Sequence, residues 1–243
     1  MAEEWFETWF DTNYYHLLYK NRDENEARQF IDALLRYLQP KADSHFLDVA
    51  CGKGRHSIYL HSQGFAATGV DLSSNSISIA SKSAEKGLSF FVRDIREPLM
   101  VSDVDFALNM FTSFGYFDTN EEHVEALINV RETLKEEGKF VIDYLNLAFV
   151  KKHLIEEEIQ IHEGVEFRIN REITNGFINK SIHVIDGDAH FEFQERVKAF
   201  TGEDLATMVS EAGFKIDATF GDYDLNPTSE DRPRVIIIAQ NNS

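Results

Sequence analysis

The chain has little that could cross-link it or anchor it in a membrane. Cys51 is the only cysteine among 243 residues, so no disulfide can form within the chain, as is typical of proteins in the reducing cytoplasm. The longest purely apolar run, Val235 to Ala239, is far shorter than the roughly 20 residues of a membrane-spanning helix. The acidic N-terminus also lacks the basic and apolar regions of a signal peptide. We therefore expect a cytoplasmic protein that has no membrane partner.

Basic residues are also scarce. The 24 Lys and Arg stand against 42 Asp and Glu, which gives a net charge of −18. Because nucleic-acid binding depends on Lys and Arg that neutralise phosphates, this composition predicts that nucleic acid is not a partner. We interpret the excess acid as surface charge that favours solubility. The nine histidines do not show the spacing of a metal site, and no metal is expected.

Three apolar segments each end in an aspartate, and these aspartates are evenly spaced. Asp48, Asp71 and Asp94 follow one another at intervals of 23 residues. This spacing fits one strand–helix unit per aspartate in a doubly wound parallel sheet, whose ligands bind beyond the carboxyl ends of the strands. The sequence therefore predicts an α/β fold with a nucleoside-type ligand at that edge of the sheet.

A glycine-containing turn follows the first of these strands. Gly52 and Gly54 have no Cβ, so the backbone there can turn tightly and come close to a ligand. Free N–H groups at the start of the next helix would then face the ligand. We expect Asp71 to accept hydrogen bonds from the two ribose hydroxyls, and Asp94, one strand further out, to accept one from an adenine amino group.

Taken together, these segments resemble the class I S-adenosylmethionine-dependent methyltransferases. Residues 47–54 match the first motif of that class, with Ala50 where many members have glycine. Residues 70–73 resemble the second motif, residues 92–95 the third and residues 104–116 the fourth. It is the ordered set of four motifs that makes the resemblance specific.

The resemblance covers residues 20–148 and 201–240. It implies a doubly wound, mostly parallel, seven-stranded Rossmann-like sheet and S-adenosyl-L-methionine as the cofactor. It also implies an enzyme that transfers a methyl group to a nitrogen or oxygen of a small-molecule acceptor. The cofactor-binding residues that it implies are Tyr15, Asp48, Ala50, Gly52, Gly54, Arg55, Asp71, Leu72, Asp94, Ile95, Asn109 and Phe111.

Two other functions compete with this interpretation. Gly52-x-Gly54-x-x-Ser57, with Asp71 nineteen residues after Gly52, nearly meets the fingerprint of a nicotinamide-dinucleotide-dependent dehydrogenase. Ser57 stands in place of the third glycine, however, and Asp94 has no role in binding that cofactor. The second alternative is a non-catalytic protein that binds S-adenosylmethionine or serves as an interaction module.

We expect a single methyltransferase domain, residues 1–243, built from three parts. Residues 1–40 form an N-terminal helical cap, residues 41–148 and 201–243 form the cofactor-binding core, and residues 149–200 form an antiparallel β insertion after the fifth strand. In enzymes that this chain resembles, N-terminal helices cover the cofactor and a tyrosine contacts its methionine end. Tyr14 and Tyr15 are the candidates for that contact and Tyr15 is favoured, although packing on the core would explain either residue.

The insertion is recognised by its alternating apolar residues and by its turns. Asn175-Gly176 and Asp186-Gly187 are two-residue hairpin signals. Because an insertion after the fifth strand leaves the sheet at its ligand edge, it could form a wall of the substrate pocket. A homodimer that forms through the same sheet is the competing explanation. At the ends of the fourth and fifth strands we expect three substrate-binding residues, Tyr116, Tyr144 and Asn146. The sequence identifies no general base.

Several boundaries of core elements can also be predicted. A helix over residues 73–86 should end at Gly87, and a helix capped by Thr119 and Glu122 should run to Gly138. Strand 139–144 should follow it. Thr201 and Asp204 should begin the last helix, and strands near 215–221 and 233–240 should form an antiparallel hairpin at one edge of the sheet.

Overall fold

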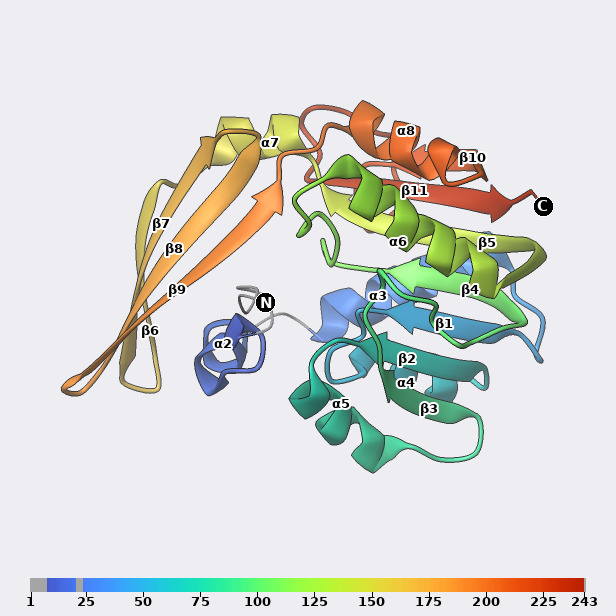
Figure 1. Cartoon of the computed structure of the whole chain (residues 1–243), viewed down its shortest axis with the longest axis horizontal. Coiled ribbons are helices and arrows are strands. Elements are labelled where there is room, and N and C mark those ends of the chain that lie inside the picture. Colours follow the sequence, from blue (N-terminus) through green and yellow to red (C-terminus); the bar gives the residue numbers. More distant parts are fainter. Residues whose placement is uncertain (1–7, 21–23, 243) are drawn as a thin grey trace.

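The computed structural model describes residues 8–20 and 24–242. Its central feature is a seven-stranded sheet with the strand order β10-β11-β5-β4-β1-β2-β3 (Figure 1). β11 runs antiparallel to both of its neighbours, and the other pairs are parallel. The predicted fold class and edge hairpin are therefore confirmed. The strands are β1 (His45–Val49), β2 (Ala66–Asp71), β3 (Leu88–Val92), β4 (Val104–Asn109), β5 (Leu134–Leu145), β10 (Phe214–Phe220) and β11 (Arg234–Asn241).

Helices cover both faces of this sheet, because successive side chains of a strand point to opposite faces. In β1, Leu47 packs in the cluster that includes residues of α6 and α8, while Phe46 packs in the cluster that includes residues of α3, α4 and α5. No helix in the described part of the chain is long and apolar enough to cross a membrane. The helices are α3 (Glu24–Leu38), α4 (Arg55–Ser62), α5 (Ser74–Ala80), the short 3-10 helix η1 (Ser81–Ser83), α6 (Asn120–Thr133) and α8 (Gly202–Glu211).

Predicted helix boundaries are confirmed where the chain has a clear capping residue. Thr119 with Glu122 forms the predicted capping box at the start of α6, and Thr201 with Asp204, predicted to begin the last helix, forms a second box at the start of α8. Gly213 has φ +90° and follows the end of α8. In each box the side-chain oxygen of the threonine accepts a backbone N–H that the helix cannot itself satisfy.

Two predicted helix ends were wrong. The helix expected over 73–86 ends at Ala80 and tightens into η1, whose serines favour turns over helix interiors. The helix expected to reach Gly138 ends at Thr133, and β5 begins at Leu134. Val104 pairs with Leu134 and Phe106 with Lys139, so the residues between them bulge out of the ladder. Leu134 joins the core, and this burial of its side chain favours the earlier start of the strand.

The insertion forms a four-stranded antiparallel sheet in the order β6-β7-β8-β9, on the left of Figure 1. The Asn175-Gly176 turn is where it was predicted, but the next turn is Gly187-Asp188, since Asp186 pairs with Ala189. A third turn at Glu163-Gly164, the first strand and the preceding helix were not predicted. The elements are α7 (Leu147–His153), β6 (Glu157–His162), β7 (Val165–Thr174), β8 (Phe177–Asp186) and β9 (Ala189–Lys198).

The short helix α2 (Asn13–Leu18) lies between the two sheets (Figure 1). Trp9, which precedes that helix, and Leu18, its last residue, are buried in one apolar cluster with the inner face of the insertion. Phe167 of β7 belongs to this cluster and is fully buried. The described part of the aromatic N-terminus thus packs mainly on the insertion. The remaining buried members of the cluster are Val165, Ile169, Ile182 and Val184.

Candidate functional site

A cavity of about 1460 Å³ lies at the carboxyl ends of the central strands. Residues that follow β1, β2, β3 and β4 line one side of it, and residues of α2 and of the insertion line the other. The cavity is therefore at the edge of the sheet that the sequence predicted. It brings together ten of the expected site residues: Tyr15, Ala50, Gly52, Arg55, Asp71, Leu72, Asp94, Ile95, Phe111 and Tyr116.

Asp71 is held in a fixed orientation at the end of β2. Its Oδ2 accepts a hydrogen bond from the backbone N–H of Gly52 at 2.8 Å, and its Oδ1 accepts one from that of Ser73, also at 2.8 Å. Burial raises the pKa of Asp71 above its usual value, while these two hydrogen bonds act in the opposite direction. Each carboxylate oxygen can accept further hydrogen bonds, so the group can receive two neighbouring hydroxyls.

The turn after β1 combines open space with backbone strain. Gly52 has φ +56°, and a Cβ built there would meet nothing within 4 Å, so the space in front of it is open to a ligand. Ala50 has φ +58°, a left-handed conformation that costs a residue with a Cβ roughly 1–2 kcal/mol. Gly54 has a different role, because a Cβ there would lie 2.5 Å from Cε1 of Phe90. Gly54 permits close packing beneath the turn and does not line the cavity.

Asp94, at the end of the third strand unit, is paired with Arg96. The Arg96 Nε lies 3.1 Å from both carboxylate oxygens, and Nη2 lies 2.7 Å from Oδ2. Burial alone would raise the pKa of Asp94, but the hydrogen bonds and charge of Arg96 outweigh it and lower the pKa. Asp94 is therefore an ionised acceptor on the cavity wall.

Two other expected cofactor residues lie beneath the cavity and shape its floor. Asp48 is 1% exposed, and its Oδ2 accepts hydrogen bonds from the N–H and the hydroxyl of Ser57 at 3.2 and 2.7 Å. Asn109 is also buried, and its amide donates to the carbonyl of Val49 at 3.3 Å and to that of Ser113 at 3.1 Å. Both hold the backbone that surrounds the cavity.

Tyr144 and Asn146, which were expected to bind substrate, are not among the residues that line the cavity. Tyr144 is buried, and its hydroxyl donates to the carbonyl of Lys198 at 2.6 Å. Asn146 caps α7 by accepting the N–H of Ala148 at 3.1 Å. Strand alternation explains the first case, because Tyr144 shares the face of Phe140 and Ile142 in the core, whereas Asp143 points the other way.

A buried ion pair beside the cavity was not predicted. Arg234, at the start of β11, donates from Nε to Oδ1 of Asp143 at 2.6 Å and from Nη2 to Oγ1 of Thr112 at 2.9 Å. The other oxygen of Asp143 accepts the N–H of Phe111 at 2.7 Å. Phe111 and Thr112 have φ of +59° and +62°, so this pair stabilises a strained turn on the cavity wall. A basic residue at the head of the apolar segment 235–239 was the available sequence signal.

The aromatic ring of Phe111 is enclosed by side chains from α4. His56 stacks on it with ring centroids 5.2 Å apart, and the Arg55 guanidinium carbon lies 4.5 Å from its centroid. Burial lowers the pKa of His56 to about 3, so this imidazole is neutral. Among the described residues, no group of three or more His, Cys, Asp or Glu side chains is arranged to hold a metal ion.

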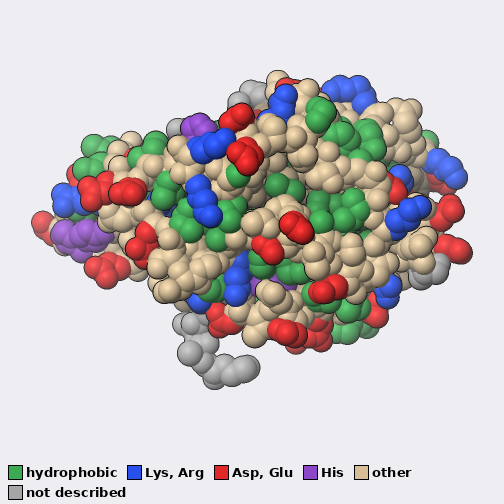
Figure 2. All heavy atoms as spheres, turned by 90° about the horizontal axis from the view of Figure 1, so that it is seen from above, with side chains coloured by type: hydrophobic (Ala, Val, Ile, Leu, Met, Phe, Trp, Pro, Cys, Tyr) green, Lys and Arg blue, Asp and Glu red, His purple; other side chains and the backbone are tan. Residues whose placement is uncertain are grey.

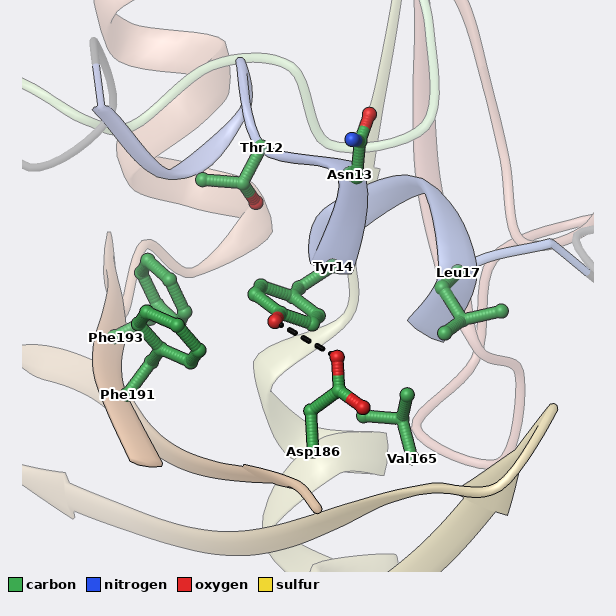
Figure 3. Close-up of a pocket in the computed structure, with 8 residues that line it drawn as sticks. All are labelled: Thr12, Asn13, Tyr14, Leu17, Val165, Asp186, Phe191 and Phe193. Carbon is green, nitrogen blue, oxygen red and sulfur yellow. Dashed lines mark hydrogen bonds between the residues drawn. The ribbon is translucent and has the colours of Figure 1, made fainter. Parts of the chain in front are cut away.

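The structure separates the two tyrosine candidates on α2. Tyr15 lines the large cavity. Tyr14 faces a smaller hollow of about 470 Å³ near the tip of the insertion, beside Leu17 and Phe191 (Figure 3). Its hydroxyl donates to Oδ2 of Asp186 at 3.0 Å. Of the two, only Tyr15 is therefore placed to meet a ligand in the large cavity.

Comparison with known proteins agrees with this geometry. Residues 40–213 match the family model described as a methyltransferase domain. A protein of Geobacillus sp. (strain WCH70) that is named as a methyltransferase is 23% identical over 99% of this chain and 100% of its own length. The dTDP-3-amino-3,4,6-trideoxy-alpha-D-glucopyranose N,N-dimethyltransferase of Streptomyces venezuelae is 30% identical over 53% of this chain and 54% of its own.

A solved structure is similar across nearly the whole chain. It is that of an S-adenosylmethionine-dependent methyltransferase from Clostridium acetobutylicum ATCC 824, with a TM-score of 0.80 and 20% sequence identity. The match covers 95% of this chain and 96% of that one. The family model favours methyl transfer over hydride transfer, and so does Asp94 on the cavity wall, which has no role in binding a nicotinamide dinucleotide. The chain belongs to the methyltransferase domain family and is a class I S-adenosylmethionine-dependent methyltransferase.

Proposed function

We propose that this enzyme transfers the methyl group of S-adenosylmethionine to an amino nitrogen of a small-molecule acceptor. The size of the cavity carries this proposal. At about 1460 Å³ it exceeds the roughly 300–1,000 Å³ of a pocket for one small ligand. The volume leaves room for an acceptor beside the cofactor. The amino-sugar N,N-dimethyltransferase among the relatives supports nitrogen as the acceptor atom, and transfer to oxygen is the alternative.

The residues around the cavity fit the cofactor. Asp71 would accept the ribose hydroxyls, and Asp94 would accept the adenine amino group with Leu72 and Ile95 beside the ring. The open space in front of Gly52 would receive the methionine portion. The remaining lining residues expected near that portion are Tyr15, Ala50, Arg55 and Phe111.

The protein has to align the acceptor more than it has to activate it. When bound, the cofactor supplies a methyl group on a sulfonium, which is already a good leaving group. The chain then needs to hold a nitrogen lone pair in line with that methyl carbon and to exclude water. Tyr116 lines the cavity, and its hydroxyl donates to the carbonyl of Thr112 at 2.8 Å. Its oxygen can therefore accept a hydrogen bond from an amine.

The first test is Asp71→Ala, with S-adenosylhomocysteine binding measured by calorimetry. Loss of a charged acceptor should weaken binding by about 1.5–3 kcal/mol. Asp188→Ala, in an exposed turn of the insertion, is the matched control and should bind like the unaltered protein. Equal affinity of the Asp71→Ala protein, with an unchanged melting temperature, would contradict the assignment. A screen of small amines coupled to detection of S-adenosylhomocysteine would then identify the acceptor.

Self-association through the insertion is a second proposal, compatible with the first. Ile159 and Ile161 on the outer side of edge strand β6 are 64% and 67% exposed, and such edges readily pair with another strand. Sedimentation velocity would measure the oligomeric state. The double variant Ile159→Lys, Ile161→Lys should be monomeric if β6 forms the interface. We also propose that the enzyme acts in the cytoplasm without a nucleic-acid partner.

A further inference from the structure

The inner face of the insertion carries one row of charged side chains that point into the cavity. Arg171 of β7 lies directly opposite Lys180 of β8, which lies opposite Glu195 of β9. All three side chains line the cavity. Across β7, β8 and β9 the rows on either side are apolar: Ile169, Ile182 and Phe193 towards the tip, and Ile173, Ile178 and Val197 towards the core.

This row is unfavourable for folding. The side chains of Arg171, Lys180 and Glu195 are only 22%, 12% and 17% exposed. Removing charges from water is costly even when they are paired, and two like charges directly opposite each other on a sheet repel. Apolar residues would continue the rows on either side without these costs. A polar row that breaks such a pattern at a cavity is expected where it serves a ligand.

Two carboxylates pair with cations of the cavity wall. Arg171 Nη2 donates to Oε2 of Glu158 at 2.6 Å, and Arg234 is held by Asp143. Neither carboxylate is among the lining residues. The lining contains seven basic and seven acidic residues, whereas the whole chain has 24 and 42. Figure 2 shows acidic side chains spread over the face seen there, so the cavity is enriched in cations relative to the rest of the chain.

Glu195 does not fully engage Lys180, because it also binds the N-terminal segment. Its Oε1 accepts hydrogen bonds from Nε1 of Trp9 at 2.8 Å and from the hydroxyl of Tyr19 at 2.5 Å. Its Oε2 lies 3.5 Å from Nζ of Lys180, a long ion-pair distance. The Tyr19 hydroxyl is also hydrogen-bonded to Lys180. Glu195 is thus largely committed to holding the N-terminal segment on the insertion.

We propose that the methyl acceptor carries an acidic group, a carboxylate or a phosphate, and that Arg171 and Lys180 bind it. The guanidinium offers a fork of N–H donors that matches either group, and the ammonium adds a point charge. Side chains directly opposite each other on adjacent strands have Cβ atoms only about 5 Å apart, so both can reach one anion. The proposal rests on the proposed function, since it assigns the acceptor end of the same cavity.

The test uses the full-length protein saturated with S-adenosylhomocysteine. Calorimetric titrations with inorganic phosphate and with acetate, at constant ionic strength, should show binding of at least one anion, and the preferred anion distinguishes phosphate from carboxylate. Arg171→Gln and Lys180→Met should each weaken this binding at least fivefold. Lys180→Arg keeps the positive charge and should bind the anion more tightly than Lys180→Met does. Lys215→Met, at an exposed position of β10 outside the cavity, should have no effect.

The inference is overturned if neither anion binds better than chloride, or if Arg171→Gln and Lys180→Met leave anion binding unchanged. An altered fold is detected separately, because each variant must still bind S-adenosylhomocysteine and melt near the unaltered protein. If the Lys180→Met protein does not fold, the inference is decided by comparing anion binding to Arg171→Gln with anion binding to Lys215→Met. Failure of the unaltered protein to bind S-adenosylhomocysteine would contradict the proposed function and would leave any observed anion binding at this row intact.

Discussion

The two sheets of this protein obtain their cores in different ways. The central sheet is covered by helices on both faces, so strands such as β4 and β11 are buried along most of their length. In the insertion, β7 alternates between buried and exposed residues, because only its inner face is covered. That cover comes from Trp9, Leu18 and their neighbours, about 150 residues earlier in the chain. The central sheet is thus self-sufficient, while the insertion depends on the N-terminus.

The largest expected effect would show this difference directly. Phe167→Ala removes a fully buried ring from the cluster shared by the insertion and the N-terminal segment. It should cost about 3–5 kcal/mol of local stability, from lost apolar burial and the cavity left behind. Hydrogen exchange should accelerate in residues 8–20 and 157–198, while β1 and β4 stay protected. Leu47→Ala in β1, equally buried, is the matched core variant and should lower protection throughout.

An equal loss of protection in both sheets of the Phe167→Ala protein would contradict the proposed independence of the central sheet. The two regions would then unfold as one cooperative unit, and the insertion would have to be regarded as part of the main core.

A smaller effect concerns a charge inside the central sheet. Burial raises the pKa of Asp48 to about 7, above the roughly 3.9 of an unfolded aspartate. Protonated Asp48 therefore contributes fully to the free energy of unfolding below about pH 4. This contribution is lost as the pH rises towards 7. An asparagine at this position keeps an oxygen for the two Ser57 hydrogen bonds and has no proton to lose. Asp48→Asn should match the unaltered protein near pH 4 and be more stable by up to about 4 kcal/mol at pH 8.

Asp105→Asn is the control for Asp48→Asn, because the pKa of Asp105 is shifted in the opposite direction. Burial would raise the pKa of Asp105, but hydrogen bonds from Lys135 and from the backbone of His45 lower it below the usual value. Its contribution is present at neutral pH and is lost in acid, so Asp105→Asn should be less stable than the unaltered protein at pH 7. Denaturant unfolding at several pH values measures both variants. A destabilised Asp48→Asn protein at pH 8 would show that the carboxylate charge is needed there.

The smallest effect is expected at Ala50. Its φ of +58° is a conformation that glycine adopts without strain. Ala50→Gly should therefore raise the melting temperature slightly, by the equivalent of about 0.5–1 kcal/mol, because relief of strain exceeds the greater flexibility of an unfolded glycine. Lys53→Gly in the same turn serves as the control and should destabilise. A lower melting temperature for Ala50→Gly would indicate that the turn relaxes around alanine.

Sequence reasoning succeeded where the signal was local. The capping threonines, the Asn175-Gly176 turn and the strand-end aspartates each depend on neighbours a few residues away. Strand β6 was not predicted. Its isoleucines face outwards, so the alternation of apolar residues there does not mark a buried face. Sequence reasoning also missed the Arg234–Asp143 pair, which joins residues 91 positions apart. The burial of Tyr144 in the core was not predicted, because the direction of a strand-end side chain depends on register.

The dependence of the insertion on Trp9 and Leu18 has a consequence for synthesis on the ribosome. Trp9 emerges early, but its hydrogen-bond acceptor, Glu195, is made 186 residues later. At about 5–20 residues per second, the interval is on the order of 10–40 s. For that time Trp9 lacks its native hydrogen-bond acceptor, although β1 to β5 can already begin to pair. The insertion can therefore acquire its complete cover only late in synthesis, and we expect Trp9 to be accessible to a chaperone until then.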